Sequence, residues 1–169
     1  MTMQSSLKSG LSRMLFFTRP TMIYEQIKSQ AVAAVPFARH VGVAITKVTR
    51  GSAAAEISPR PELLNHVGTM HAAALFALGE ATSGAAMAGT LAPLILNVRP
   101  VASAASIRYL KPAKGRIQAS GRVRGEPDNL VGELNAQGKV RFELDVVMTD
   151  EQGQSVCEMT VEWHARLNR

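Results

Sequence analysis

The stretch from Asn65 to Gly89, NHVGTMHAAALFALGEATSGAAMAG, constrains the fold of this 169-residue chain more than any other. Between Leu63 and Val98, Glu80 is the only Asp, Glu, Lys or Arg. From Thr69 onward the segment is rich in Ala and Leu and lacks proline, which predicts a helix capped by Thr69 and ended by Gly89 and Pro93. A helix that is apolar all round is buried on every side. This one is too rich in small residues, and too interrupted, to span a membrane.

Glu80 is the residue of this helix that needs an explanation. Ala and Gly fill much of the segment, so other backbone can approach the helix closely. A lone carboxylate in such surroundings is destabilising unless it is neutralised or hydrogen-bonded. At about 100° per residue, the side chains on its side of the helix are Ala73, Phe76, Gly84 and Met87. This apolar stripe predicts a raised pKa for Glu80, which suits a general base.

The rest of the chain predicts one more helix and six strands. Residues Thr21–Val35 stop before Pro36 and carry apolar side chains at helical spacing, which predicts a short amphipathic helix. Alternating polarity predicts strands over Val41–Thr49, Ser52–Ser58, Val101–Leu110, Arg116–Arg124, Lys139–Thr149 and Ser155–Arg166, and loops over Gly89–Pro100 and Glu126–Gly138. Strands with one apolar face are typical of an antiparallel sheet covered on one side. We therefore expect an α+β fold, a curved antiparallel sheet wrapped around the central helix, with residues 1–20 as a tail and 21–169 as one domain.

Composition limits the classes of function. The single cysteine, Cys157, lies where strand alternation points inward, so we expect a small buried side chain rather than a nucleophile. The four histidines are scattered and the common metal and dinucleotide motifs are absent, so we expect no metal and no redox cofactor. The net charge of +6 is spread without a run of Lys or Arg, which favours a small anionic ligand over nucleic acid. The N-terminus lacks the apolar core of a secretory signal, so we expect a cytoplasmic protein without a membrane partner.

The start of the central helix offers a second kind of chemistry. Free N–H groups of Met70, His71 and Ala72 would form a site for a developing oxyanion, and Asn65 can add a side-chain donor. His71 and Glu80 are nine residues apart, about 13 Å along one helix, so one carbonyl group cannot contact both. If both ends take part, two antiparallel chains must share each site. We therefore expect at least a dimer.

The order of these residues resembles the hotdog-fold acyl-CoA thioesterases, most closely their phenylacetate-degradation branch or a related hotdog family without an assigned substrate. The resemblance rests on N-H-V-G-T-M-H-A-A at residues 65–73, on Glu80 beyond it, and on R-Y-L-K-P-A-K at residues 108–114. It implies a hotdog fold over most of Val41–Arg166. It also implies hydrolysis of an acyl-CoA, or a similar thioester, by a homodimer or homotetramer.

The resemblance implies four catalytic roles, position by position. Glu80 falls on the general base or nucleophile, and the N–H of Ala72 falls on the oxyanion donor that the family takes from a glycine. Asn65 falls on the asparagine that orients the thioester carbonyl or the attacking water, and His71 falls on an orienting histidine. The chain departs from the family at Ala72-Ala73, where the family has Gly-Gly. An alanine N–H still donates, but its methyl group narrows the room for the substrate.

Further residues are candidates for supporting roles. Ser83 lies about 60° from Glu80 around the helix and can hydrogen-bond its carboxylate; the alternative is a serine bonded back to its own helix. A serine that the family often carries after the helix corresponds to Ala102, with Ser103 beside it. The phosphates of coenzyme A are expected to meet four basic residues, Arg99, Arg108, Lys111 and Lys114.

Two other functions stay open. Ala72 and the missing serine also suit a hotdog protein that binds acyl-CoA without hydrolysing it. His66 lies fourteen residues before Glu80, the spacing of the His and acid in hotdog acyl-thioester dehydratases, although Gly68 is the only proline or glycine of their pattern that is present. A dehydratase or hydratase would use His66 and Glu80.

Overall fold

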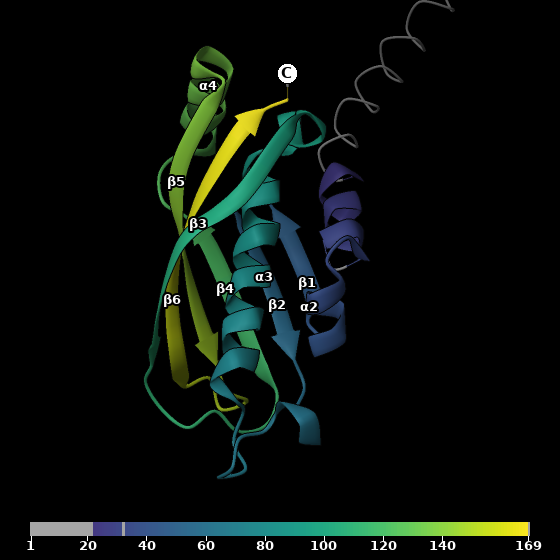
Figure 1. Ribbon diagram of the computed structural model, residues 1–169, viewed down its shortest axis with the longest axis vertical. Coiled ribbons are helices and arrows are strands. Elements are labelled where there is room, and N and C mark those ends of the chain that lie inside the picture. The colour runs from purple at the N-terminus through teal and green to yellow at the C-terminus, as the bar shows by residue number, and fades with distance from the viewer. Residues whose placement is uncertain (1–21, 32, 169) are drawn as a thin grey trace, which may run out of the picture.

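The computed structural model describes residues 22–31 and 33–168, in which a long helix lies across one face of a sheet (Figure 1). Residues 22–31 are helical, as predicted, and the expected tail, residues 1–20, lies outside the described residues. The other elements, with η for a 3₁₀ helix, are α2 Pro36–Val41, β1 Ala44–Thr49, β2 Ser52–Ile57, η1 Pro61–Leu63, α3 Ala72–Thr90, η2 Ala92–Asn97, β3 Val98–Tyr109, β4 Ile117–Val123, α4 Pro127–Gln137, β5 Lys139–Thr149 and β6 Ser155–Leu167. No helix in this described part is long and apolar enough to cross a membrane.

All six strands belong to one antiparallel sheet, in the order β1-β2-β4-β5-β6-β3. The sheet curves around α3, which packs against β1, β2, β4, β5 and β6 (Figure 1). The N-terminal helix lies beside α3 on the same side of the sheet (Figure 1). The α+β hotdog fold expected from the sequence is therefore confirmed.

Alternation along the strands places the core between the sheet and α3. β4 alternates buried and exposed residues over its whole length, and the apolar faces predicted for β5 and β6 are buried. Cys157 is fully buried in β6, and this burial raises the pKa of its thiol to about 11. A thiol with that pKa stays protonated near neutral pH, in agreement with the expected packing role.

Small residues let α3 lie very close to the sheet. A Cβ atom on Gly89 would overlap the carbonyl oxygen of Thr49 in β1, and a Cβ atom on Gly79 would overlap Met159 and Met148. On the sheet side, Gly121 also leaves room for the helix, since a Cβ atom there would lie 3.1 Å from Thr82 Cγ2. The predicted close approach of backbone to this helix is confirmed.

The predicted loop over Glu126–Gly138 is wrong, because most of it forms α4. Pro127 lies in the first turn of α4, and Gly138 ends it in the left-handed conformation at φ 69°. Leu134 is fully buried against the sheet and anchors the helix. Proline at the start and glycine just past the end are ordinary helix boundaries, so residues that suggest a loop here delimit a helix.

Two other segments also differ from prediction. The predicted loop from Gly89 is wrong, since α3 continues to Thr90 and is followed by η2. β3 begins at Val98, three residues earlier than expected. Before the sheet, α2 was not predicted; Pro36 lies in its first turn, and Gly42 at φ 86° ends it, so β1 starts at Ala44.

We expect Gly89→Ala to lower the free energy of unfolding by about 1–3 kcal/mol, because its methyl group would overlap the Thr49 carbonyl oxygen. The matched control is Gly132→Ala within α4, where nothing lies within 4 Å of the added Cβ atom. This control should raise the free energy of unfolding by about 0.5–1 kcal/mol, since alanine favours a helix over glycine. Urea unfolding followed by circular dichroism measures both, and a stabilising Gly89→Ala would contradict the close packing.

Candidate active site

The start of α3 is capped by His71, so the predicted Thr69 cap is wrong. His71 has extended backbone, φ −66° and ψ 142°, and its Nδ1 accepts a 3.0 Å hydrogen bond from the Ala73 N–H. Thr69 lies in the preceding turn, where its hydroxyl accepts a 2.8 Å hydrogen bond from the side-chain amide of Asn65. The helix therefore begins two residues later than the sequence suggests.

One of the three N–H groups expected to be free remains available. The Met70 N–H donates to the carbonyl of Ala113 and the His71 N–H donates to that of Leu63, both at 2.8 Å, so these two predictions are wrong. No hydrogen bond among the described residues uses the Ala72 N–H, and Ala72 is exposed. The positive end of the helix dipole thus presents one unused donor.

Asn65 holds together the turn that precedes the helix. Its Oδ1 accepts hydrogen bonds of 3.1 Å from the N–H groups of Val67 and Thr69, and its Nδ2 donates to the Thr69 hydroxyl. The second Nδ2 hydrogen is not used by any hydrogen bond in the described part of the chain. His66 is exposed in the same turn. Asn65 therefore has a structural role and keeps one donor for a ligand.

Glu80 lies in the middle of α3, half-buried in the wall of an apolar cavity of about 700 Å³. The cavity lies between the N-terminal helix, α3 and η2, and its apolar lining includes Ile23, Ile27, Val35, Met87, Ile95 and Trp163. None of the hydrogen bonds or ion pairs among the described residues involves the Glu80 carboxylate. Burial raises the pKa of this carboxyl group above its usual range. The predicted direction of the pKa shift is therefore confirmed.

The N–H at the start of α3 and the carboxylate in the middle of α3 are far apart within one chain. Ala72 and Glu80 are eight residues apart on the same helix, about 12 Å along its axis. That separation is several times the length of a hydrogen bond. One chain therefore presents a donor end and a carboxylate that cannot contact the same carbonyl group.

The Ser83 hydroxyl does not bond the Glu80 carboxylate. It donates to the backbone carbonyl of Glu80 at 2.7 Å and accepts a 3.1 Å hydrogen bond from Trp163 Nε1. Ser83 is fully buried. Of the two predicted interpretations, the structure favours the serine bonded back to its own helix, and it adds a link to β6.

Ser103 lies on the other face of the sheet from Glu80. Its hydroxyl donates to the Glu162 carboxylate at 2.6 Å. The next residue, Trp163, contacts Ser83 of α3, and successive side chains of a strand point to opposite faces. Glu162 and Ser103 therefore face away from α3.

The four residues expected to bind coenzyme A lie in different places. Lys111 and Lys114 flank Ala113, whose carbonyl binds the Met70 N–H, so both lie beside the start of α3. Arg108 is ion-paired with Glu158. Arg99 lies near the opposite end of β3, where its Nε donates to Asn168. The structure does not bring all four together.

The sequence did not predict how the site is enclosed. The amphipathic spacing of Ile23 and Ile27 predicted a helix, but it did not show that this helix forms one wall of the cavity. Trp163 belongs to the strand predicted over Ser155–Arg166, and the structure adds that it lines the cavity. Tyr109, whose hydroxyl donates to the Ala72 carbonyl at 3.2 Å, gave no signal beyond its strand.

The chain is similar to several solved structures over most of its length. It is 26% identical to Pseudomonas aeruginosa PA5026, a protein of unknown function described as a probable thioesterase, with a TM-score of 0.74 over 85% of this chain and 95% of that one. It is 20% identical to the E. coli PaaI protein from the phenylacetic acid degradation operon, with a TM-score of 0.62 over 87% and 98%. It is 24% identical to a hypothetical thioesterase of Streptococcus pneumoniae TIGR4 in a crystal structure with coenzyme A, with a TM-score of 0.58 over 76% and 88%. The last two likenesses concern the fold.

One sequence family matches nearly the whole described part of the chain. No curated protein matches the sequence at a significant level. The sequence model of one family, described as a domain of unknown function, DUF4442, matches residues 24–165, from the N-terminal helix into β6. The chain belongs to the DUF4442 family, and its fold is that of the hotdog thioesterases.

Proposed function

We propose that this protein hydrolyses an acyl-CoA, or a similar thioester, with Glu80 as general base or nucleophile. The observation that carries the proposal is the Glu80 carboxylate in the wall of an apolar cavity of about 700 Å³, without a hydrogen-bond partner among the described residues. A carboxylate in such surroundings takes up a proton more readily, as general base catalysis near neutral pH requires. A cavity of this size and lining suits the acyl group of a thioester.

The proposed reaction needs one proton carrier and one oxyanion donor. Glu80 accepts a proton from water, and the water oxygen forms a bond to the thioester carbonyl carbon, giving a tetrahedral oxyanion. The C–S bond then breaks, and Glu80 returns the proton to the leaving thiolate. If Glu80 attacks directly, its oxygen bonds to the carbonyl carbon, the C–S bond breaks, and the thiolate leaves, giving a mixed anhydride. Water then hydrolyses this anhydride to the free acid and the Glu80 carboxylate, and the proton released goes to the thiolate. Neither route requires a metal or a redox cofactor.

The oxyanion donor is the Ala72 N–H, assisted by Asn65, of a second copy of the chain. Within one chain about 12 Å of helix separates Ala72 from Glu80, so the carbonyl group must be held between two antiparallel helices. Each pair of chains would then contain two composite sites. We expect Lys111 and Lys114, which lie beside the helix start, to bind the phosphates of coenzyme A.

The edge strand β3 supports pairing of two chains. It has 12 residues, most of them exposed, and forms one end of the sheet. A long edge with unpaired backbone groups is a template for a strand from another chain. Val101 and Tyr109 expose about half of their surface on this strand, at 58% and 48%. We expect a homodimer with β3 at its interface.

Two of the similar structures support thioester chemistry. PA5026 is described as a probable thioesterase, and the S. pneumoniae protein is described as a hypothetical thioesterase with coenzyme A. At 26% and 24% identity these likenesses suggest the reaction class and leave the acyl group open. The aliphatic lining of the cavity favours an alkyl acyl chain.

We expect Ala72→Pro to lower kcat for acyl-CoA hydrolysis by about 10²–10³-fold, because it removes one oxyanion donor. Proline is tolerated at the first position of a helix, and the preceding His71, at ψ 142°, already has the backbone that a residue before proline requires. The melting temperature of Ala72→Pro should therefore stay close to that of the wild type. Ala72→Gly, which keeps the N–H, is the control and should retain activity.

The same assay separates the alternative functions. It uses short, aromatic and long alkyl acyl-CoAs with the wild type and Glu80→Gln, and measures release of free thiol. Binding of acyl-CoA without turnover would make this a binding protein. Hydration of a 2-enoyl thioester that depends on His66 would make it a hydratase. Equal activity of Ala72→Pro and Ala72→Gly would remove the helix start from the mechanism.

We expect Glu80→Gln to raise the melting temperature at pH 8 and to leave it unchanged below about pH 4. Burial raises the pKa of Glu80 in the folded protein, so between the unfolded and folded pKa values the folded chain holds the extra proton. Stability therefore falls as the pH rises through that window, and a neutral amide avoids the loss. Exposed Glu133→Gln is the control. A lower melting temperature for Glu80→Gln at pH 8 would show a stabilising partner for the carboxylate instead.

We expect two inactive variants to restore activity when they form mixed dimers. A dimer of one Glu80→Gln chain and one Ala72→Pro chain has one site with both groups intact and one site with neither. Random mixing should recover about a quarter of the wild-type activity, since half of the dimers are mixed and each has one working site. Thiol release after co-refolding measures this. No recovery, with mixed dimers present, would place both groups in one chain.

A further inference from the structure

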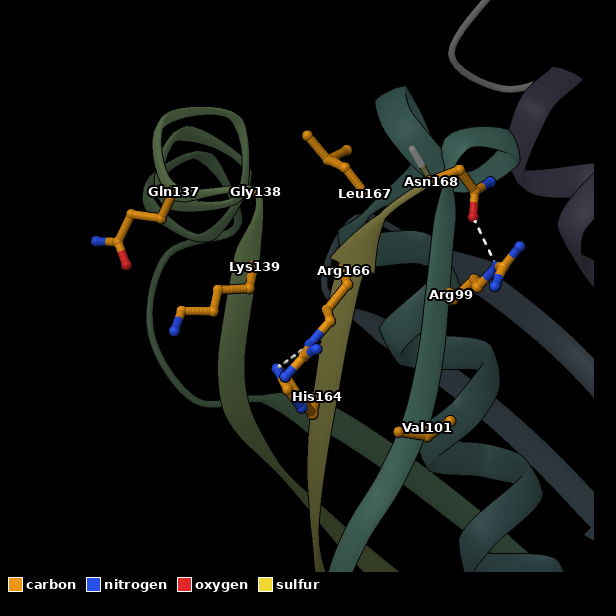
Figure 2. Close-up of a pocket in the computed structure, with 9 residues that line it drawn as sticks. All are labelled: Arg99, Val101, Gln137, Gly138, Lys139, His164, Arg166, Leu167 and Asn168. Atoms are coloured by element: carbon orange, nitrogen blue, oxygen red, sulfur yellow. Dashed lines mark hydrogen bonds between the residues drawn. The ribbon is translucent and has the colours of Figure 1, made fainter.

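A second concavity lies on the face of the sheet that α3 does not cover. It has a volume of about 960 Å³ and is formed by the end of α4 and the adjoining ends of β5, β6 and β3 (Figure 2). Ala165 of β6 is fully buried on the α3 side, so its neighbours His164 and Arg166 point to the opposite face. This concavity is therefore separated from Glu80 by the sheet.

Three cations stand in one row across the concavity. Arg166 of β6 is directly opposite Arg99 of β3 on one side and Lys139 of β5 on the other. Figure 2 shows these side chains on three neighbouring strands. Like charges at directly opposite positions of an antiparallel pair destabilise the sheet. The row is thus unfavourable in the protein alone.

No carboxylate group lines this concavity in the described part of the chain. Arg99 Nε donates to Asn168 Oδ1 at 3.1 Å, and Arg166 Nε donates to His164 Nε2 at 3.4 Å. Both acceptors are neutral or basic groups. These contacts orient the two guanidinium groups without neutralising them. Glu133 lines an adjoining hollow with Lys139 and Arg166, but no ion pair among the described residues joins it to either cation.

On the rest of this sheet face, three arginines are ion-paired with acids. Arg108 is ion-paired with Glu158, and Arg141 lies 3.6 Å from Glu162. Arg124 of the neighbouring segment binds Asp145 through two hydrogen bonds. Arg122 of β4 has no ion pair among the described residues but lies directly opposite Asp145, whereas the three cations of the row lie opposite only one another. The missing negative charge there can be supplied by a ligand.

We propose that this concavity binds a small polyanion with two or more phosphoryl groups, such as a diphosphate. Arg99 and Lys139 lie two strand spacings apart, about 9.5 Å between their backbones, with Arg166 between them. A diphosphate contacts Arg166 and both flanking cations, whereas a single phosphate cannot span the row. Guanidinium groups bind phosphoryl oxygens through paired hydrogen bonds, and Asn168 adds a polar side chain.

The test is titration of the full chain with inorganic pyrophosphate, without thioester, by calorimetry and by thermal unfolding. The wild type should bind at about millimolar concentration or below and gain melting temperature. Arg166→Gln and Lys139→Gln should each weaken binding by at least about tenfold. Arg122→Gln is the matched control: it is exposed on the same face in β4 but does not line the concavity, and it should bind like the wild type.

Two further measurements keep the result interpretable. Without ligand, Arg166→Gln should melt no lower than the wild type, because it relieves like-charge repulsion, so weaker binding is not misfolding. ADP should bind as pyrophosphate does, and inorganic phosphate about tenfold more weakly, if two phosphoryl groups are recognised together. No binding of pyrophosphate, equal binding of phosphate, or an equal loss in Arg122→Gln would overturn the proposal. None of these outcomes depends on thioester hydrolysis.

Discussion

The close packing of α3 against the sheet is the contact on which the rest of the structure depends. Gly79 and Gly89 leave no room for a side chain between helix and strands, so a bulky residue there would separate the two layers. Buried Thr82 and Thr90 donate to carbonyl groups of their own helix, at 2.6 Å and 2.8 Å. These two threonines are thereby buried without partners from the sheet, so the interface beside them can consist of apolar atoms.

That packing also sets the chemistry of Glu80. Because the helix is apolar on nearly every side, its one carboxylate finds no basic partner in the described part of the chain and lines the cavity that the N-terminal helix encloses. Desolvation is therefore what raises its pKa. The helix also separates this carboxylate from the unused Ala72 N–H by about 12 Å, because the two residues are eight positions apart on a helix with a fixed rise per residue. If both groups act on one carbonyl group, as we propose, the site must be shared between two chains.

The sequence predicted the parts of the fold that local patterns control. Alternation gave the strands, and a run of small residues with one charge gave α3. The helix cap could not be chosen, because Thr69 and His71 can both cap a helix; the choice depends on Asn65, whose amide holds the Thr69 hydroxyl in the turn. α4 was missed because its anchor, Leu134, becomes apparent only when the helix packs on the sheet. The cavity depends on where the N-terminal helix packs, which no local pattern specifies.

In the proposed site, the pair Ala72-Ala73 affects access to the helix start and keeps the backbone donor. Thioesterases that the sequence resembles have Gly-Gly here. Alanine favours the helix over glycine by about 0.5–1 kcal/mol per residue and keeps the backbone N–H. Both alanines are exposed, so their methyl groups contact whatever approaches the helix start. The hydroxyl of Tyr109 donates to the Ala72 carbonyl and holds this turn in place. In the site that we propose, these methyl groups restrict the size of the group that can reach the Ala72 N–H, and the backbone donor is retained.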